Sequence, residues 1–214
     1  MLKDIKLGFK LLRYGYKLKL NVIMLVFFTI FGIASEIFSK GTSIIGGVYF
    51  MMSGMFTFQL IMSMDVSELI QSTSLKKKLQ IYIPVLASTV INLILFTVVL
   101  IQMGVADKTQ IIYTLFMLDV ILLITYLYTS ICYKYFVLGF ILFMVAFMAA
   151  FMALDNTAFM GFADTIAALG LPVIALFGYI AIFVGGALEI LIGELLYKKP
   201  LSEFAFRGFF RDAK

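Results

Sequence analysis

Long apolar runs separated by short polar segments dominate the pattern of this chain. Six runs are long enough to cross a bilayer core, and they lie at residues 20–38, 44–64, 81–103, 111–132, 136–154 and 171–196. A transmembrane helix needs about 20 predominantly apolar residues, and the bilayer core requires every backbone polar group to be bonded internally. The pattern therefore predicts an all-α membrane protein with six transmembrane helices in a single domain.

The polar segments differ in length. Residues 39–43 allow only a tight hairpin between the first two runs, whereas residues 65–80 use sixteen positions to connect the second run to the third. Residues 155–170 are too short to span a membrane and too apolar for a plain loop. Four apolar side chains recur there at helical spacing: Phe159, Phe162, Ile166 and Leu169. We expect one or two short extracellular helices in this segment, which lie at the membrane interface or re-enter the membrane.

Lysine and arginine predict the orientation of the chain. Six basic residues precede the first run, Lys76, Lys77 and Lys78 follow the second, Lys134 follows the fourth, and five lie after the sixth. These make up 15 of the 17 basic residues, and basic residues favour the cytoplasmic side of short loops. We expect a multi-pass protein with both its N-terminus and its C-terminus in the cytoplasm, and with residues 197–214 as a basic cytoplasmic tail.

The segment at residues 1–19 has the pattern of an amphipathic interfacial helix. Its cations follow one another at three- and four-residue steps: Lys3, Lys6, Lys10, Arg13 and Lys17. Such a helix lies along the membrane surface and contacts the anionic lipid of the inner leaflet. A second interpretation adds contact with a cytoplasmic partner.

Composition weighs against catalytic chemistry in this chain. Hydrophobic residues make up 63% of it, charged residues only 14%, and the mean hydropathy is +1.09. Histidine is absent and Cys132 is the single cysteine, so the commonest general base and any thiolate metal cluster are missing. The sequence also lacks the G-x-x-x-x-G-K-[ST] loop that cradles nucleotide phosphates. We expect a chain that is not an enzyme by itself, with no metal and no nucleic-acid partner.

Three polar residues inside the apolar runs are candidates for a transport pathway: Asp119, Asn92 and Glu189. Ionisable groups within a membrane are costly and often functional, although hydrogen bonding to a neighbouring helix is the alternative. Gly178, Ala181 and Gly185 form a stripe along which another helix can approach closely.

Two further carboxylates lie near the ends of apolar runs. We expect Glu36 to reach the membrane interface at the outer end of the first run. Glu194 precedes Lys198 by four residues, a spacing that predicts an ion pair within one helix.

Several of these features together resemble the permease subunits of ABC transporters of the type 2 exporter class. They are the basic amphipathic start, the first hairpin closed by a few polar residues, the short helices before the sixth run, and the sequence SGMFTFQLIMSMDVSELIQSTSLKKKLQ at 53–80. The layout covers the whole chain, and the resemblance at the level of residues covers about 65 to 80.

The resemblance implies a function and partners. In that family the loop after the second span holds the coupling helix that docks on the ATPase. The corresponding residues here would be Ser67, Glu68, Leu69, Ile70, Gln71, Ser72, Thr73, Ser74 and Leu75. The chain would be a permease in a bacterial cell membrane, paired with a second identical or related permease and with a dimer of ABC ATPase subunits. Those partner ATPases would bind ATP and magnesium, so this chain would hold no cofactor.

Two other classes of function stay open on the sequence. A small-solute-binding membrane subunit, like the substrate-binding component of a vitamin uptake system, also has about six spans in about 200 residues. An intramembrane enzyme would need clustered polar groups, whereas the three candidate pathway residues are scattered along the chain.

Overall fold

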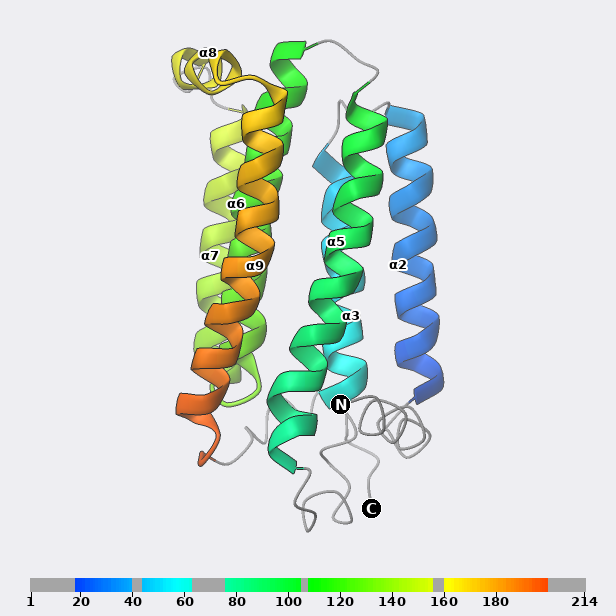
Figure 1. The fold of residues 1–214 in the computed structure, drawn as a ribbon, viewed down its shortest axis with the longest axis vertical. Coiled ribbons are helices and arrows are strands. Elements are labelled where there is room, and N and C mark those ends of the chain that lie inside the picture. The colour runs from blue at the N-terminus through cyan, green and yellow to red at the C-terminus, as the bar shows by residue number, and fades with distance from the viewer. Residues whose placement is uncertain (1–17, 40–43, 63–75, 105–107, 156–159, 200–214) are drawn as a thin grey trace.

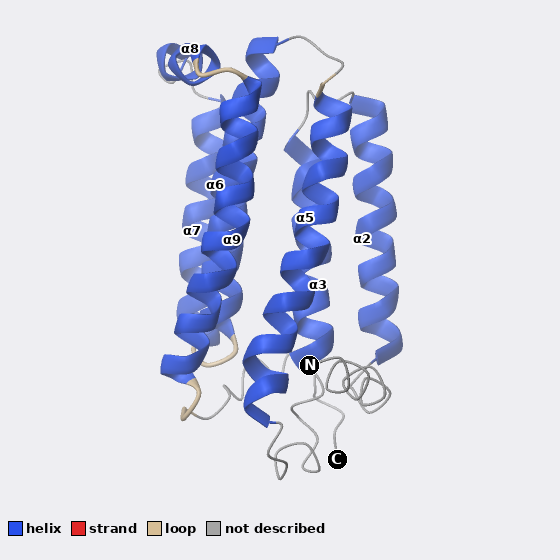
Figure 2. Ribbon diagram, in the orientation of Figure 1, coloured by secondary structure: helices blue, strands red, loops and turns tan. Residues whose placement is uncertain are grey.

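In a computed structural model, the described residues are 18–39, 44–62, 76–104, 108–155 and 160–199. Within these ranges the chain consists of helices and short turns, with no β-strand (Figure 2). The all-helical prediction is therefore confirmed for the part of the chain that the structure describes. The predicted docking segment Ser67–Leu75 and the five cations at the start of the chain, from Lys3 to Lys17, lie outside the described ranges.

Six long helices lie side by side in the structure (Figure 1). They are α2 (Leu18–Ser39), α3 (Ile44–Met62), α5 (Ile83–Met103), α6 (Lys108–Cys132), α7 (Phe136–Asp155) and α9 (Leu171–Leu196). Five of them, α2, α3, α5, α6 and α9, are long and apolar enough to cross a membrane. Helix α7 has 20 residues, of which Val137–Ala146 form an apolar stretch.

A short helix, α8 (Met160–Ala168), falls within the segment for which short helices are predicted. It lies across one end of the long helices (Figure 1). The ring of Phe162 meets that of Phe116 on α6 edge to face at 5.9 Å, and Ile166 is buried. These contacts hold α8 against α6, while the side of the membrane on which it lies stays a prediction.

The long helices form two groups. Helix α3 packs between α2 and α5, and α6 packs between α7 and α9. The groups meet where α3 contacts α6 and where α5 contacts α9. We call the end at which α2 begins and α9 ends the basal end; it lies at the bottom of Figure 1.

Small residues allow the helices to approach closely along the contacts of α9. Gly178 leaves room for the ring of Phe96 on α5, and Gly185 leaves room for the ring of Tyr126 on α6. Ala181, which lies between these glycines in the sequence, is also buried. Without a hydrophobic driving force between helices in lipid, such close packing is a main source of helix association. The predicted small-residue stripe is thus at a helix interface.

Candidate functional site

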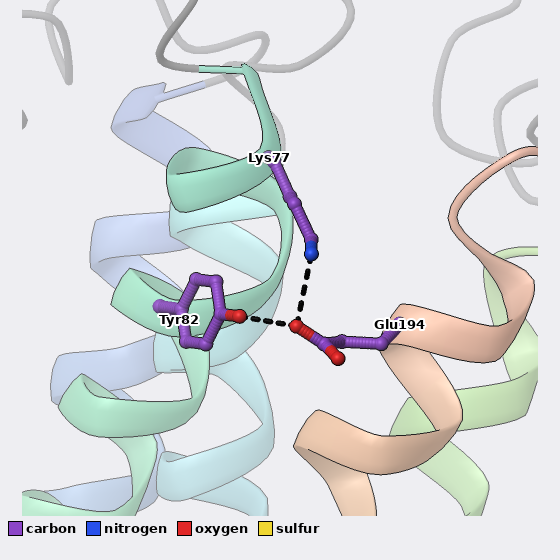
Figure 3. A network of polar contacts seen from close by, with 3 residues as sticks. All are labelled: Lys77, Tyr82 and Glu194. Carbon is purple, nitrogen blue, oxygen red and sulfur yellow. Dashed lines mark hydrogen bonds and ion pairs between the residues drawn. The ribbon is translucent and has the colours of Figure 1, made fainter.

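The basal end carries a polar network that joins α5 to α9. A five-residue π-helix, η3 (Lys78–Tyr82), leads directly into α5. Backbone bonds in a π-helix link residues five apart, so the side chains of Lys77 and Tyr82 project on the same side. Both reach toward Glu194 near the end of α9 (Figure 3).

Glu194 is the acceptor at the centre of this basal network. The Lys77 ammonium lies 3.0 Å from Glu194 Oε1, and the Tyr82 hydroxyl donates a hydrogen bond to the same oxygen (Figure 3). The Lys77 ammonium also lies 5.9 Å from the centre of the Tyr82 ring. The hydrogen bond to Glu194 raises the pKa of Lys77 above its ordinary value.

The sequence-based pairing of Glu194 with Lys198 is therefore wrong. Sequence spacing identifies neighbours on one helix only. In the structure Glu194 is bonded instead to Lys77 and Tyr82, which belong to a segment distant in sequence. The side chains of Lys77 and Glu194 are 46% and 39% exposed, so water screens their attraction. The basal network therefore acts as a tether between the start of α5 and the end of α9, and it contributes little to stability.

A second polar contact lies within the bundle, where α5, α6 and α9 meet. The Asn92 amide nitrogen on α5 donates to the Tyr126 hydroxyl on α6 at 3.0 Å. The Tyr126 hydroxyl donates in turn to Thr89 Oγ1 at 3.5 Å. Asn92 also packs against Gly54 of α3, where any side chain would collide with its amide. Asn92 thus makes the helix-to-helix hydrogen bond that was the alternative to a pathway role.

Glu189 on α9 lies closer to the basal end and is 2% exposed. The Thr129 hydroxyl on α6 donates to its Oε1, whereas Oε2 has no hydrogen-bond partner. The side chain lines a cavity of about 30 Å³ together with the polar residues Gln80, Thr129, Ser130, Tyr133 and Lys134. A cavity of this size and polarity can hold water, because about one probe sphere of volume suffices.

Asp119 on α6 is 4% exposed, and neither of its carboxylate oxygens has a hydrogen-bond partner. It faces Gly178 of α9, beside the ring of Phe96. Asp119, Asn92 and Glu189 thus all lie at contacts between α5, α6 and α9, but each has different neighbours. Among the described residues, no group of three or more histidine, cysteine, aspartate or glutamate side chains could hold a metal ion.

Glu36, which is expected near the membrane interface, is buried between two helices, and its depth in the membrane stays a prediction. It is 1% exposed and packs against Gly46 at the start of α3, close to the backbone of Gly47. The glycines remove the side chains that would otherwise separate α2 from α3 at this point. Position near the end of an apolar run indicates depth in the membrane, but it does not indicate which neighbour covers the side chain.

An outward-facing groove lies between α5 and α9, toward the basal end. Its volume is about 650 Å³, and its walls are almost entirely apolar. The lining residues are Lys78, Tyr82, Ile83, Val85, Leu86, Thr89, Phe183, Gly186, Ala187 and Ile190. The sequence analysis identified neither this groove nor the basal network. One signal in the sequence could have indicated the basal network. The three lysines at 76–78 are expected on the same side of the membrane as Glu194.

Comparison of the chain with protein-family models, with curated proteins and with solved structures finds no match.

Proposed function

We propose that this chain is the permease subunit of an ATP-driven ABC exporter in a bacterial cell membrane. In this proposal α7 also crosses the membrane, which brings the number of spans to six. Both termini are cytoplasmic, and the basal end therefore faces the cytoplasm. The chain forms the translocation pathway with a second permease subunit, and a dimer of separate ATPase subunits binds ATP and magnesium.

The observation that supports this proposal is the tether between Lys77 and Glu194. Residues 65–80 lie between α3 and α5, and Lys77 near the end of that segment is ion-paired to Glu194 of α9, which also packs against α5. An ATPase that binds residues 67–75 would then act on both helices at once. Of the three candidate pathway residues, Asn92 lies on α5 and Glu189 on α9.

ATP binding can drive such a movement only if it favours one arrangement of the helices over another. The interface between α5 and α9 suits a rearrangement, because each of these helices packs more extensively on its own group than on the other. In the proposed cycle, closure of the ATPases changes the contact of α5 with α9 and exposes the pathway to the opposite side.

Co-purification of partner subunits tests the proposal. The affinity-tagged chain, extracted in mild detergent from its native host, should bring down an ABC ATPase that mass spectrometry identifies. Deletion of residues 67–75 should abolish that association while the protein still inserts into the membrane. Deletion of the nine residues 206–214 is the length-matched control and should preserve the association.

Retention of the ATPase by the 67–75 deletion would contradict the assigned docking segment. Recovery of no ATPase with the intact chain would contradict the exporter assignment itself. Membrane insertion of each variant is checked by its resistance to extraction with alkaline carbonate.

A further inference from the structure

The small polar cavity beside Glu189 lies where the two helix groups meet at the basal end. Its walls come from α3, η3, α5, α6 and α9. The lining includes Glu189, which is buried, and Lys134 and Tyr197, which are half-buried. The cavity therefore leads from the interior of the bundle toward the basal surface.

The two oxygens of the Glu189 carboxyl group have different surroundings. Oε1 is bonded to the Thr129 hydroxyl, whereas Oε2 has no hydrogen-bond partner in the protein. A buried carboxyl oxygen in that state costs free energy, and water in a polar cavity removes the cost. The volume of about 30 Å³ has room for about two water molecules, since one needs about 10 to 15 Å³.

The contact with Thr129 fits both protonation states of Glu189. The Thr129 hydroxyl has one hydrogen, and its oxygen lies 3.1 Å from the carbonyl oxygen of Thr125 and 3.0 Å from that of Tyr126. When Glu189 is ionised, Thr129 donates this hydrogen to Oε1. When Glu189 is protonated, its own hydroxyl donates to Thr129, which turns its hydrogen to a backbone carbonyl. Neither state leaves the contact without a hydrogen bond.

We propose that Glu189 is a proton-binding site that exchanges its proton with water at the basal end through this cavity. A hydronium ion in the cavity gives its proton to the carboxylate and remains as water, and release reverses this step. Ionisable groups inside membrane proteins are costly and often belong to proton relays. This inference does not depend on the chain being an ABC permease.

The groups that face Glu189 come from every element around the cavity. The titratable ones are Tyr126, Cys132, Tyr133 and Lys134 from α6 and the turn after it, and Tyr197 after α9. The other walls contribute Gln80 and Ile81 from η3, Phe58 from α3 and Val85 from α5. Among these described groups only Lys134 ordinarily carries a charge at neutral pH, and its ammonium donates to the Lys199 carbonyl oxygen at 2.8 Å. Tyrosine and cysteine ordinarily titrate above neutral pH, so a change on the acidic side of neutrality reports on the carboxyl group.

Infrared spectroscopy of the full chain in nanodiscs tests the site. A protonated carboxyl group has a carbonyl band that an ionised one lacks, and deuterium exchange shifts this band to lower frequency. In mildly acidic buffer Glu189 should contribute one such band, which should disappear reversibly as the pH is raised. Transfer to D₂O should shift the band at once, because the carboxyl hydrogen is in contact with water in the cavity.

Two pairs of variants assign the band and the route of exchange. Glu189→Gln should lose the band, whereas Asp119→Asn makes the same kind of change at another buried carboxyl group and should keep it. Ser130→Val adds apolar bulk to the cavity wall and should abolish the rapid shift in D₂O, whereas Ser35→Val makes the same change on α2 and should preserve it. Ser130→Thr adds a single methyl group, should slow the shift, and replaces Ser130→Val should that variant give no monodisperse chromatographic peak.

Three results would overturn the proposal. An unchanged carbonyl region in Glu189→Gln would show that Glu189 holds no proton. A Glu189 band that persists as the pH is raised, or that does not shift in D₂O, would show that the proton is not exchanged with basal water. An undiminished rapid shift in a folded Ser130→Val variant would contradict the assigned route through the cavity. All of these measurements use the chain alone, so their outcome is separate from the recovery of an ATPase.

Discussion

The ring of Tyr126 on α6 packs directly against Gly185 on α9, where an added Cβ would lie 2.5 Å from ring atom Cδ2. The hydroxyl of the same tyrosine accepts a hydrogen bond from Asn92 on α5. Tyr126 is 3% exposed and so connects three helices with one side chain. It lies where the two helix groups meet, which makes it one of the contacts through which a change in α5 would reach α9.

Gly185→Ala should destabilise the bundle because the added methyl group collides with the Tyr126 ring. We expect a loss of about 1 to 3 kcal/mol in the free energy of unfolding, the usual cost of overpacking. Thermal unfolding in detergent, followed by the loss of the monodisperse peak, provides the measurement. Gly104→Ala is the control, because its Cβ would make ordinary contacts at 3.6 Å and should leave the transition unchanged.

Tyr126→Phe should leave the ring packing intact and remove only the hydroxyl. The Asn92 amide then loses its acceptor, and we expect a loss of roughly 0.6 kcal/mol, the average for hydrogen bonds between membrane helices. The same unfolding assay applies. Tyr179→Phe removes a hydroxyl from α9 that bonds Thr97 at a more exposed position, and a larger effect there than at Tyr126 would contradict the importance of the buried contact.

Reversal of the charges at Lys77 and Glu194 tests the basal tether. Lys77→Glu or Glu194→Lys alone places like charges side by side, and the double variant restores the pair. Because both side chains are substantially exposed, a double-mutant cycle should give only a small coupling energy. High salt should reduce this coupling.

The pH dependence of the same pair follows from the raised pKa of Lys77. A raised pKa in the folded state means that the stabilisation is fully present below the ordinary lysine pKa. It is lost as the pH rises through the higher value of the folded state. The coupling energy should therefore be constant around neutral pH, and a decline there would show that Lys77 does not hold its proton as the pairing requires.

Hydropathy predicted the helices well because the requirement for length and apolarity is local to each segment. The run predicted at 171–196 coincides with α9, and that at 20–38 lies within α2. The small-residue stripe at Gly178 and Gly185 was likewise readable, because helical spacing alone places these residues on one face.

Contacts between segments distant in sequence were not predictable in this way. Glu36 was expected at the interface and is buried against α3, and Glu194 was assigned to Lys198 rather than to Lys77. In both cases helix packing determines the neighbour of the side chain, and one sequence does not reveal that packing. The π-helical turn before α5 is the clearest example, since it aligns Lys77 with Tyr82 and leaves no signal in composition.

Substitution of Asp119 can separate a functional role of its carboxylate from a structural role. It is buried, and neither of its oxygens has a hydrogen-bond partner. A buried polar group in that state costs about 1 to 3 kcal/mol, and a side chain of similar size without polar atoms removes the cost. Asp119→Leu should therefore raise the free energy of unfolding by that amount, which the thermal unfolding assay detects.

In the proposed permease, the buried carboxylate of Asp119 would act in transport. Asp119→Leu and Asp119→Asn should both abolish transport by the assembled complex, although they leave the fold intact. Glu189→Leu provides the contrast, because Glu189 Oε1 accepts a hydrogen bond from Thr129 and its loss leaves that hydroxyl without this acceptor. We expect a smaller gain in stability from Glu189→Leu than from Asp119→Leu. A lower stability of Asp119→Leu than of the natural chain would instead indicate that the carboxylate supports the packing of α6 on α9.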